Sequence, residues 1–157
     1  MQVLELGRDA QSNNASPLNP CLAPEVRVLV WEQGHIAVGE IAVGSLLVVP
    51  PSHARVRTAA VRDIRRYKSS RLIRINHKID CTEGHPFLAT SGNWVCAREL
   101  AVGDWLMGAS GPVRIENIEP VCRTSGTVID VCVDHPFRAE GFVTMSKSAF
   151  RQRGVLP

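Results

Sequence analysis

The chain has 157 residues, of which 45% are hydrophobic and 21% charged, with 12 glycines, 10 prolines and a formal net charge of +3. This length and composition suit one folded domain with its own core and exclude a disordered or coiled-coil chain. No apolar run approaches the roughly 20 residues that cross a bilayer, and the charged start "MQVLELGRDA" is unlike a signal peptide. We therefore expect a cytoplasmic protein that does not contact membranes.

The first predicted strands follow a polar segment. Residues 1–20 end in "SNNASPLNP", which has the composition of an extended flank. From Cys21 onward, "VRVLVWEQG" alternates and is rich in β-branched residues, and "HIAVGEIAVGSLLVVPP" follows a turn at Gly34. Both patterns predict strands.

Residues 60–79 carry an ambiguous and locally basic pattern. Their apolar spacing allows a helix, whereas "RLIRINHKI" alternates as a strand, and we expect a hairpin that turns near Ser69 and Ser70. The interval around it is rich in cations: Arg55, Arg57, Arg62, Arg65, Arg66, Lys68, Arg71, Arg74 and Lys78. A surface for nucleic acid is one interpretation of this interval. However, Tyr67 is the only aromatic residue within it that could stack on bases, so a solvated face is favoured and nucleic acid is not expected as a partner.

The remaining chain consists of short apolar runs separated by Gly, Pro, Asn and Asp. This spacing predicts an all-β domain, in which "WVCAREL" alone suggests a helical turn. The five cysteines are Cys21, Cys81, Cys96, Cys122 and Cys132, an odd number without CxxC spacing, which favours reduced thiols over a disulfide framework.

The chain also contains a degenerate internal repeat. "EIAVGSLL" (40–47) aligns with "ELAVGDWL" (99–106), and the same alignment brings Val28-Leu29 onto Phe87-Leu88 without a gap. Such a repeat predicts two equivalent subdomains that share a core. The alternative is a chance similarity between strand ends. The second "HPF" motif, at 135–137 after that at 85–87, supports the repeat.

Four motifs in order resemble the Hint family, which contains inteins, bacterial intein-like domains and the autoprocessing domain of Hedgehog proteins. They are "CLAPEVRVLVWEQGHIAVGEIAVGSLLVV", "CTEGHPFLA", "NWVCARELAVGDWL" and "VIDVCVDHPFRAEGFV". The resemblance implies an all-β, pseudo-two-fold, horseshoe-like fold over residues 21–145, between flanks at 1–20 and 146–157. Within this family the chain resembles a non-splicing bacterial intein-like domain or a mini-intein.

The resemblance implies self-processing of the Pro20-Cys21 bond. Cys21 would attack the Pro20 carbonyl and form a thioester, with His85 as the acid for the departing amine and Thr82 orienting the amide or the oxyanion. Asp130 would tune the thiol and move its proton, and His135 would assist later steps. The alternative for each of these polar residues is an ordinary structural place at a strand end or in the core.

The sequence departs from splicing inteins at its C-terminal motif. Met145-Ser146 stands where splicing requires His-Asn, so there is no carboxamide to cyclise and full splicing is not expected. The expected acyl acceptor is water, an external thiol or another nucleophile, with Ser146 or Ser148 as weaker options, and the substrate is the chain's own N-terminal flank. Pro20 should slow the acyl shift.

Two further alternatives stay open at this stage. One is a degenerate Hint scaffold without chemistry. The other is a structural zinc site made from Cys81, His85, Cys132 and His135, which would supply two thiolates and two imidazoles. We expect no cofactor and no metal. We also expect the protein to be a monomer.

Overall fold

The computed structural model describes residues 19–50, 56–123 and 126–146. Nearly all of the regular structure is β, as the sequence predicts. The strands are β1 (Arg27–Val30), β2 (Gly34–Ala37), β3 (Leu46–Val48), β4 (Thr58–Ala60), β5 (Asp63–Lys68), β6 (Arg71–Ile75), β7 (Ile79–Cys81), β8 (Pro86–Leu88), β9 (Trp94–Cys96), β10 (Trp105–Gly108), β11 (Gly111–Arg114), β12 (Ile118–Cys122), β13 (Thr127–Cys132), β14 (Phe137–Ala139) and β15 (Phe142–Thr144).

Helical structure in the described residues is limited to two single 3-10 turns, η2 (Val38–Glu40) and η4 (Ala97–Glu99). The second of these confirms the helical turn expected in "WVCAREL". Within the described part of the chain, no helix has the length and apolar character needed to cross a membrane.

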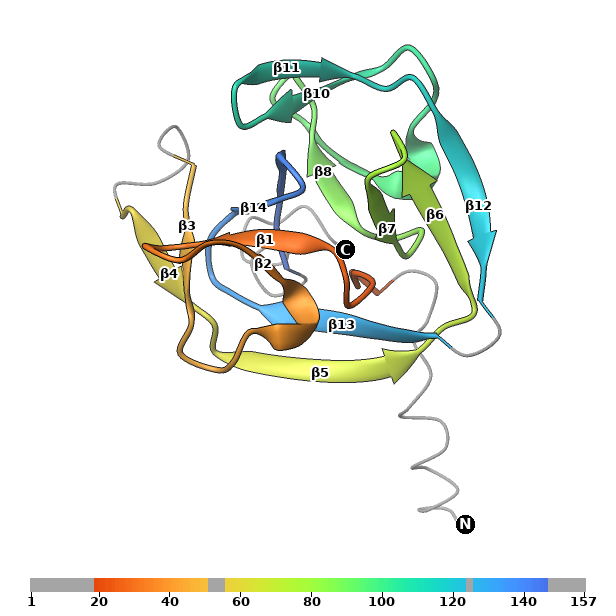
Figure 1. Cartoon of the computed structure of the whole chain (residues 1–157). Helices are drawn as coiled ribbons and strands as arrows, with labels where there is room; N and C mark the ends of the chain where they lie inside the picture. Colours follow the sequence, from red (N-terminus) through yellow and green to blue (C-terminus); the bar gives the residue numbers. More distant parts are fainter. Residues whose placement is uncertain (1–18, 51–55, 124–125, 147–157) are drawn as a thin grey trace.

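The largest sheet winds around the centre of the molecule (Figure 1). Its strand order is β11-β10-β15-β14-β1-β3-β4, with β2 paired to β1, β8 to β15, and β9 to β8. The two "HPF" motifs lie on either side of the same strand, because both Phe87 and Phe137 are register partners of Thr144 in β15. The C-terminal strand therefore joins the two halves of the sheet.

A long antiparallel ribbon replaces the hairpin expected near Ser69 and Ser70. β5 pairs with β13 and β6 pairs with β12, so the two strands on either side of these serines do not pair with each other. The ribbon stays connected across the interruption through Ser69 N–H to Gly126 O at 2.9 Å and Arg123 N–H to Ser70 O at 2.7 Å. The hairpin prediction was wrong: the alternating stretch is the strand β6 only as far as Ile75, and the chain turns at 76–78 so that β6 forms a hairpin with β7 instead.

Matching turns in the two halves confirm the internal repeat. In the segments 42–45 and 101–104, the first N–H donates to the side-chain oxygen of the last residue, at 3.0 and 2.9 Å. The third residue of each is a glycine with positive φ, +96° at Gly44 and +102° at Gly103. Both glycine N–H groups then donate 2.8 Å bonds to the next strand region, to Val61 O and Ile115 O. The fold is thus the expected pseudo-two-fold, all-β horseshoe.

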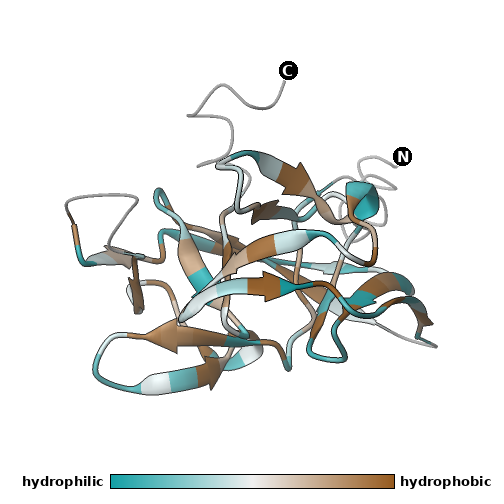
Figure 2. Cartoon of the chain, turned by 90° about the horizontal axis from the view of Figure 1, so that it is seen from above, coloured by the Kyte–Doolittle hydropathy of each residue, from teal (hydrophilic) through white to brown (hydrophobic). Residues whose placement is uncertain are grey.

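The core lies between the two halves. Figure 2 shows apolar residues along the strands and polar residues at many of the turns. The largest fully buried side chains are Phe87, Phe137, Phe142, Leu22, Leu47, Ile75, Ile79, Leu106, Ile115, Ile129 and Met145. Phe87 packs edge-on against Phe142, with ring centroids 5.9 Å apart. Because Leu22 belongs to this core, folding of the whole domain fixes the backbone beside Cys21.

The expected flanks fall mostly outside the described residues. Of residues 1–20 the structure describes only Asn19 and Pro20, and of residues 146–157 only Ser146.

Candidate active site

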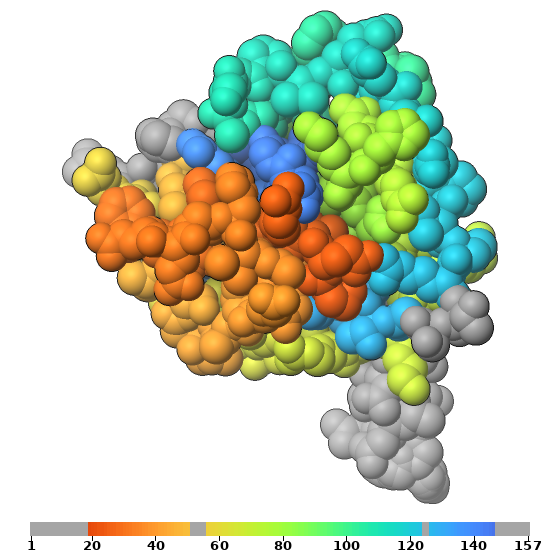
Figure 3. Space-filling view, in the orientation of Figure 1, coloured from red at the N-terminus to blue at the C-terminus, as the bar shows by residue number. Residues whose placement is uncertain are grey.

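The segment after Pro20 enters the molecule as a short inserted strand between β7 and β13. Leu22 and Ile129 of β13 exchange two backbone hydrogen bonds, of 2.9 and 2.8 Å. On the other side, Leu22 bridges to Cys81 of β7, and Ala23 N–H donates to Asp80 O at 3.0 Å. Figure 3 shows this red-orange segment in the middle of one face of the molecule, next to the yellow-green residues of the β6–β7 region. Two neighbouring strands therefore hold the Cys21 backbone in place.

Thr82 bridges the backbone on both sides of the Pro20-Cys21 bond. Its Oγ1 accepts the Cys21 N–H at 3.0 Å and donates its own proton to the Asn19 carbonyl in a short hydrogen bond. Thr82 N–H also donates to Cys21 O at 3.0 Å. Thr82 is 1% exposed and Cys21 is fully buried. Of the two roles expected for Thr82, orientation of the amide is the one that matches these contacts.

The Thr-x-x-His spacing is that of a tight turn. His85 N–H donates to Thr82 O at 3.1 Å, which closes a four-residue turn between β7 and β8. The first and last residues of a β-turn lie within about 7 Å of each other at Cα. This turn therefore brings the imidazole close to the threonine that holds the Cys21 amide.

His85 lies in an apolar pocket with one polar neighbour. The ring packs edge-on against Phe87, with centroids 5.3 Å apart, and its Nε2 lies 2.6 Å from Thr144 Oγ1. Nδ1 is buried and has no hydrogen-bond partner among the described residues. Burial lowers the pKa of His85 to about 3, so the resting imidazole is neutral at pH 7.

Asp130 faces Cys21 across the inserted strand. Since Leu22 and Ile129 are a hydrogen-bonded pair in an antiparallel arrangement, Cys21 and Asp130 form the next opposed pair. Such non-hydrogen-bonded pairs have Cα atoms about 4.5 Å apart and side chains on the same face. Asp130 is 6% exposed. The register thus places a carboxyl group beside the Cys21 thiol, which the sequence could suggest only by resemblance.

His135 stands apart from these four residues. It lies half-buried in the loop between β13 and β14, and no described hydrogen bond connects it to Cys21, Thr82, His85 or Asp130. Hydrogen bonds and strand register therefore relate four of the five predicted site residues, Cys21, Thr82, His85 and Asp130, to one another.

An ion-pair network next to the inserted strand was not foreseen. Arg74 donates to the two oxygens of buried Asp80 at 2.7 and 2.9 Å, and Arg123 lies 3.3 Å from the same carboxylate. Arg123 also pairs with Glu25, two residues beyond Ala23. The Arg74 hydrogen bonds hold the pKa of Asp80 below its ordinary value, against the opposing effect of burial. This network fixes the segment that follows Cys21.

The C-terminal residues of the domain have packing roles. Met145 is fully buried and packs against Trp94 and Cys96. Ser146 donates its hydroxyl to Val133 O at 2.7 Å and accepts the Val133 N–H at 3.2 Å. These contacts anchor the chain end that follows β15.

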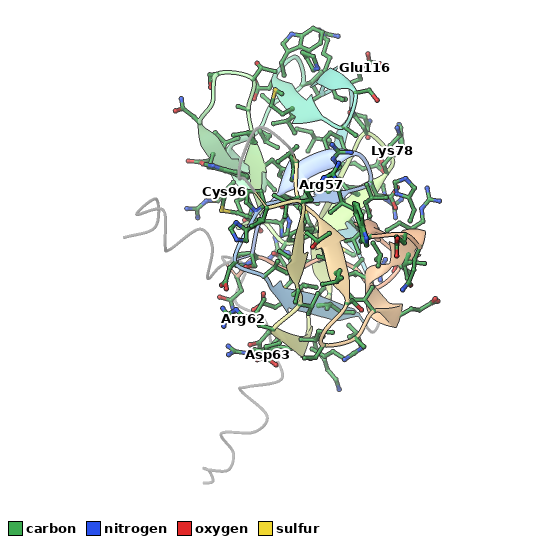
Figure 4. The ribbon with its side chains drawn as sticks, turned by 90° about the vertical axis from the view of Figure 1, so that its left-hand side faces the viewer. Arg57, Arg62, Asp63, Lys78, Cys96 and Glu116 are labelled. Carbon is green, nitrogen blue, oxygen red and sulfur yellow. The ribbon has the colours of Figure 1, made fainter. Side chains whose placement is uncertain are left out.

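The basic interval does not form one continuous cationic patch. In Figure 4, Arg57, Arg62 and Lys78 lie at separate places around the molecule. Several of the arginines are paired with carboxylates, as in Arg62 with Asp134 at 2.9 Å and Arg65 with Asp63 at 3.0 Å.

The zinc alternative is also not assembled. Among residues 19–50, 56–123 and 126–146, no group of three or more His, Cys, Asp and Glu side chains could hold a metal ion. This set includes Cys81, which is fully buried and whose pKa burial raises.

Solved structures resemble this fold over most of its length. A bacterial intein-like domain from Clostridium thermocellum has 20% identity and a TM-score of 0.70, covering 81% of this chain and 98% of that one. The gp41-1 intein has 22% identity and a TM-score of 0.64, with 81% and 98% covered. A DnaB intein from Synechocystis sp. PCC 6803 has 14% identity and a TM-score of 0.63, with 82% and 99% covered. No family model and no curated protein matches the sequence.

The fold is therefore that of the Hint domains. The structures that share this fold are inteins and a bacterial intein-like domain, which match the chain across about four fifths of its length.

Proposed function

We propose that this domain processes itself by an N-to-S acyl shift at Pro20-Cys21. The observation that carries the proposal is the position of Thr82, whose hydroxyl binds the Cys21 N–H and the Asn19 carbonyl and so holds the peptide bond between them. A buried nucleophile beside an oriented amide gains a large effective concentration, roughly 10⁵ M or more in favourable intramolecular reactions. The Hint fold of the domain supports this chemistry.

The shift begins at the thiol. Asp130 takes the Cys21 proton, and the sulfur then attacks the Pro20 carbonyl carbon to form a tetrahedral oxyanion. The C–N bond of that intermediate breaks as the Cys21 nitrogen takes a proton from His85. The products are a Pro20 thioester on Cys21 and a free Cys21 amine. The proton lost by sulfur replaces the one gained by nitrogen, so the step consumes no net proton.

The burial of His85 sets when it can act as an acid. With a pKa of about 3 the resting ring is neutral, so it gains its proton only during the reaction. The negative charge that develops on the oxyanion favours the protonated imidazole. The proton that His85 gains comes from the Cys21 thiol and is passed on by Asp130.

The thioester is then resolved by water or by an external thiol. Met145 and Ser146 occupy the place where splicing needs a carboxamide side chain, so no succinimide can form there. We therefore propose N-terminal cleavage or acyl transfer without splicing.

Intact mass spectrometry of the purified chain over time tests this proposal. We expect loss of residues 1–20, faster with dithiothreitol or hydroxylamine, because these nucleophiles attack a thioester and spare an amide. Cys21→Ala should abolish the cleavage, and His85→Ala should slow it by roughly 10²-fold or more. Cys122→Ala removes an exposed thiol from β12 and is the matched control that should cleave normally.

An unchanged full-length mass under every condition would contradict self-cleavage. It would instead favour the alternative function, a Hint scaffold without chemistry. That alternative has one observation in its favour, since the residue that carries the scissile carbonyl is a buried proline.

A further inference from the structure

Thr144 on β15 contacts His85 although neither the sequence motifs nor the proposed chemistry assign it a role. Its Oγ1 lies 2.6 Å from His85 Nε2 and donates to Pro86 O, also at 2.6 Å. Thr144 is fully buried, so water does not compete for these bonds. Pairing of Thr144 with Phe87 in the sheet fixes the hydroxyl at this place.

The proton count at this hydroxyl determines the form of the imidazole. A threonine hydroxyl has one hydrogen, and the Pro86 carbonyl can only accept. The hydroxyl proton therefore goes to Pro86 O, and Oγ1 must act as the acceptor in its hydrogen bond with the His85 ring. His85 Nε2 is then the donor and carries a hydrogen. The opposite arrangement would leave two acceptor oxygens 2.6 Å apart with no proton between them.

The same assignment defines the other ring nitrogen. Burial keeps the ring neutral, and a neutral imidazole has only one N–H, so Nδ1 carries a lone pair. That lone pair is buried and has no hydrogen-bond partner among the described residues. Phe87 packs against the ring at 5.3 Å, and Phe142 packs against Phe87 at 5.9 Å, which limits ring rotation.

We propose that Thr144 is a positioning residue that fixes His85 as the Nε2–H tautomer and so makes Nδ1 the atom that takes up and delivers the proton. The inference rests on the proposed function for the use of Nδ1, whereas the tautomer itself can be observed in a chain that does not cleave. A sequence motif could not identify Thr144, because it lies 59 residues from His85 and meets it only through β-sheet pairing.

The test compares three residues at position 144 in two backgrounds. Thr144→Val keeps the branched shape and removes the hydroxyl, and Thr144→Ser restores the hydroxyl. Thr58→Val makes the same change at a half-buried threonine on β4, which carries no site residue. In a Cys21→Ala background, the ¹⁵N chemical shifts of the His85 ring report the tautomer. In the proteins that retain Cys21, mass spectrometry reports the cleavage rate in hydroxylamine.

We expect the Nε2–H pattern in the parent, Thr144→Ser and Thr58→Val proteins, and its loss in Thr144→Val. Cleavage should slow by about 10- to 100-fold in Thr144→Val, with recovery in Thr144→Ser. A backbone amide spectrum checks that each variant is folded. An Nδ1–H pattern in the parent, or a Thr144→Val protein with the parent's tautomer and rate, would overturn the inference. If the tautomer changes as expected but no variant cleaves, the proposed function fails and the role of Thr144 in fixing the ring stands.

Discussion

His85 combines burial with a titratable ring, and the two properties oppose each other. The side chain is 2% exposed and its pKa lies at about 3, because charging the ring in an apolar pocket costs free energy. The same burial that stops the ring from titrating at neutral pH keeps its Nδ1 lone pair away from water. The residue is therefore suited to hold a proton briefly, during the reaction, and it makes the fold sensitive to acid.

The first prediction at the residue scale concerns stability against pH. The unfolded-state pKa is near 6.5 and the folded-state pKa is about 3, so the unfolded chain binds more protons between these values. The stabilising contribution is complete above pH 6.5 and decreases as the pH falls toward 3. We expect the free energy of unfolding to fall by about 1.4 kcal/mol per pH unit well below the unfolded-state pKa. Urea unfolding of the Cys21→Ala protein at several pH values measures this slope.

His85→Gln provides the control for that slope. Glutamine is neutral throughout this pH range. The slope of the unfolding free energy against pH should therefore decrease in the variant by the amount that corresponds to about one proton. Asp80 acts in a lower pH window: its folded-state pKa lies below the ordinary value of 3.8, so its contribution disappears only as the pH falls below that value. Between pH 6 and 4.5, the parent protein should take up roughly one proton at His85 on unfolding. If His85→Gln kept the parent's slope of unfolding free energy against pH in this range, the assignment to His85 would be wrong.

Among the structural elements, the inserted segment at 21–25, which forms β-bridges only at Leu22, connects the site to the rest of the fold. Its backbone bonds reach β7 on one side and β13 on the other. The ion pairs of Asp80 with Arg74 and Arg123 then fix the end of this strand. Each site side chain is presented by one of these elements or by the turn that follows β7.

The sequence predicted local parts of these elements better than their partners. The Thr-x-x-His motif is a turn whose two ends are only three residues apart, so its geometry can be predicted from sequence. The pairing of Asp63 with Cys132 in the ribbon depends on the whole fold, and alternation of side chains carries no information about it. Thr144 was missed for the same reason, since it meets His85 only through sheet pairing. The Arg74–Asp80 pair was missed because the hairpin that joins β6 to β7 was placed at the wrong turn.

The prediction at this scale is that Asp80 stabilises the fold through its arginines. Asp80→Asn should lower the free energy of unfolding by roughly 1 to 3 kcal/mol, because a 5% exposed carboxylate that accepts charged hydrogen bonds is lost. The 37% exposed Arg74 side chain can regain water, which keeps the cost below that of a fully buried pair. Urea unfolding at pH 7 in the Cys21→Ala background measures the change.

Glu25→Gln is the matched control for the same network. Its carboxylate side chain is 61% exposed and pairs with Arg123, and exposed ion pairs contribute about 0 to 1 kcal/mol. If Asp80→Asn were as mild as Glu25→Gln, the buried carboxylate would not be what holds the strand.

In the whole molecule, the two halves contain the same type of turn, at 42–45 in one and at 101–104 in the other. The alignment of "EIAVGSLL" with "ELAVGDWL" predicted this from sequence, and the matched turns confirm it. The copies differ in the residues before the equivalent strands: β8 follows the turn that contains His85, whereas β1 follows the segment that contains Cys21. The family resemblance implied roles for both His85 and His135, and among the described residues hydrogen bonds link only His85, through Thr82, to the Cys21 site. A repeat in sequence predicts equivalent backbones and leaves side-chain roles open.

Equivalent backbones lead to a quantitative prediction about the paired glycines. Gly44 and Gly103 have φ of +96° and +102°, and a Cβ at either would meet nothing closer than 3.8 Å. The cost of Gly→Ala at both positions is therefore backbone strain and not a clash, roughly 1 to 2 kcal/mol each. Because the two glycine N–H groups bond to different segments, at Val61 O and Ile115 O, the double variant should lose about the sum of the two single losses. Gly→Asn at each position, which enters positive φ more easily, should cost less than Gly→Ala. Urea unfolding of the five variants in the Cys21→Ala background tests this, and a large loss at one glycine with none at the other would mean that the two halves do not depend on the same turn.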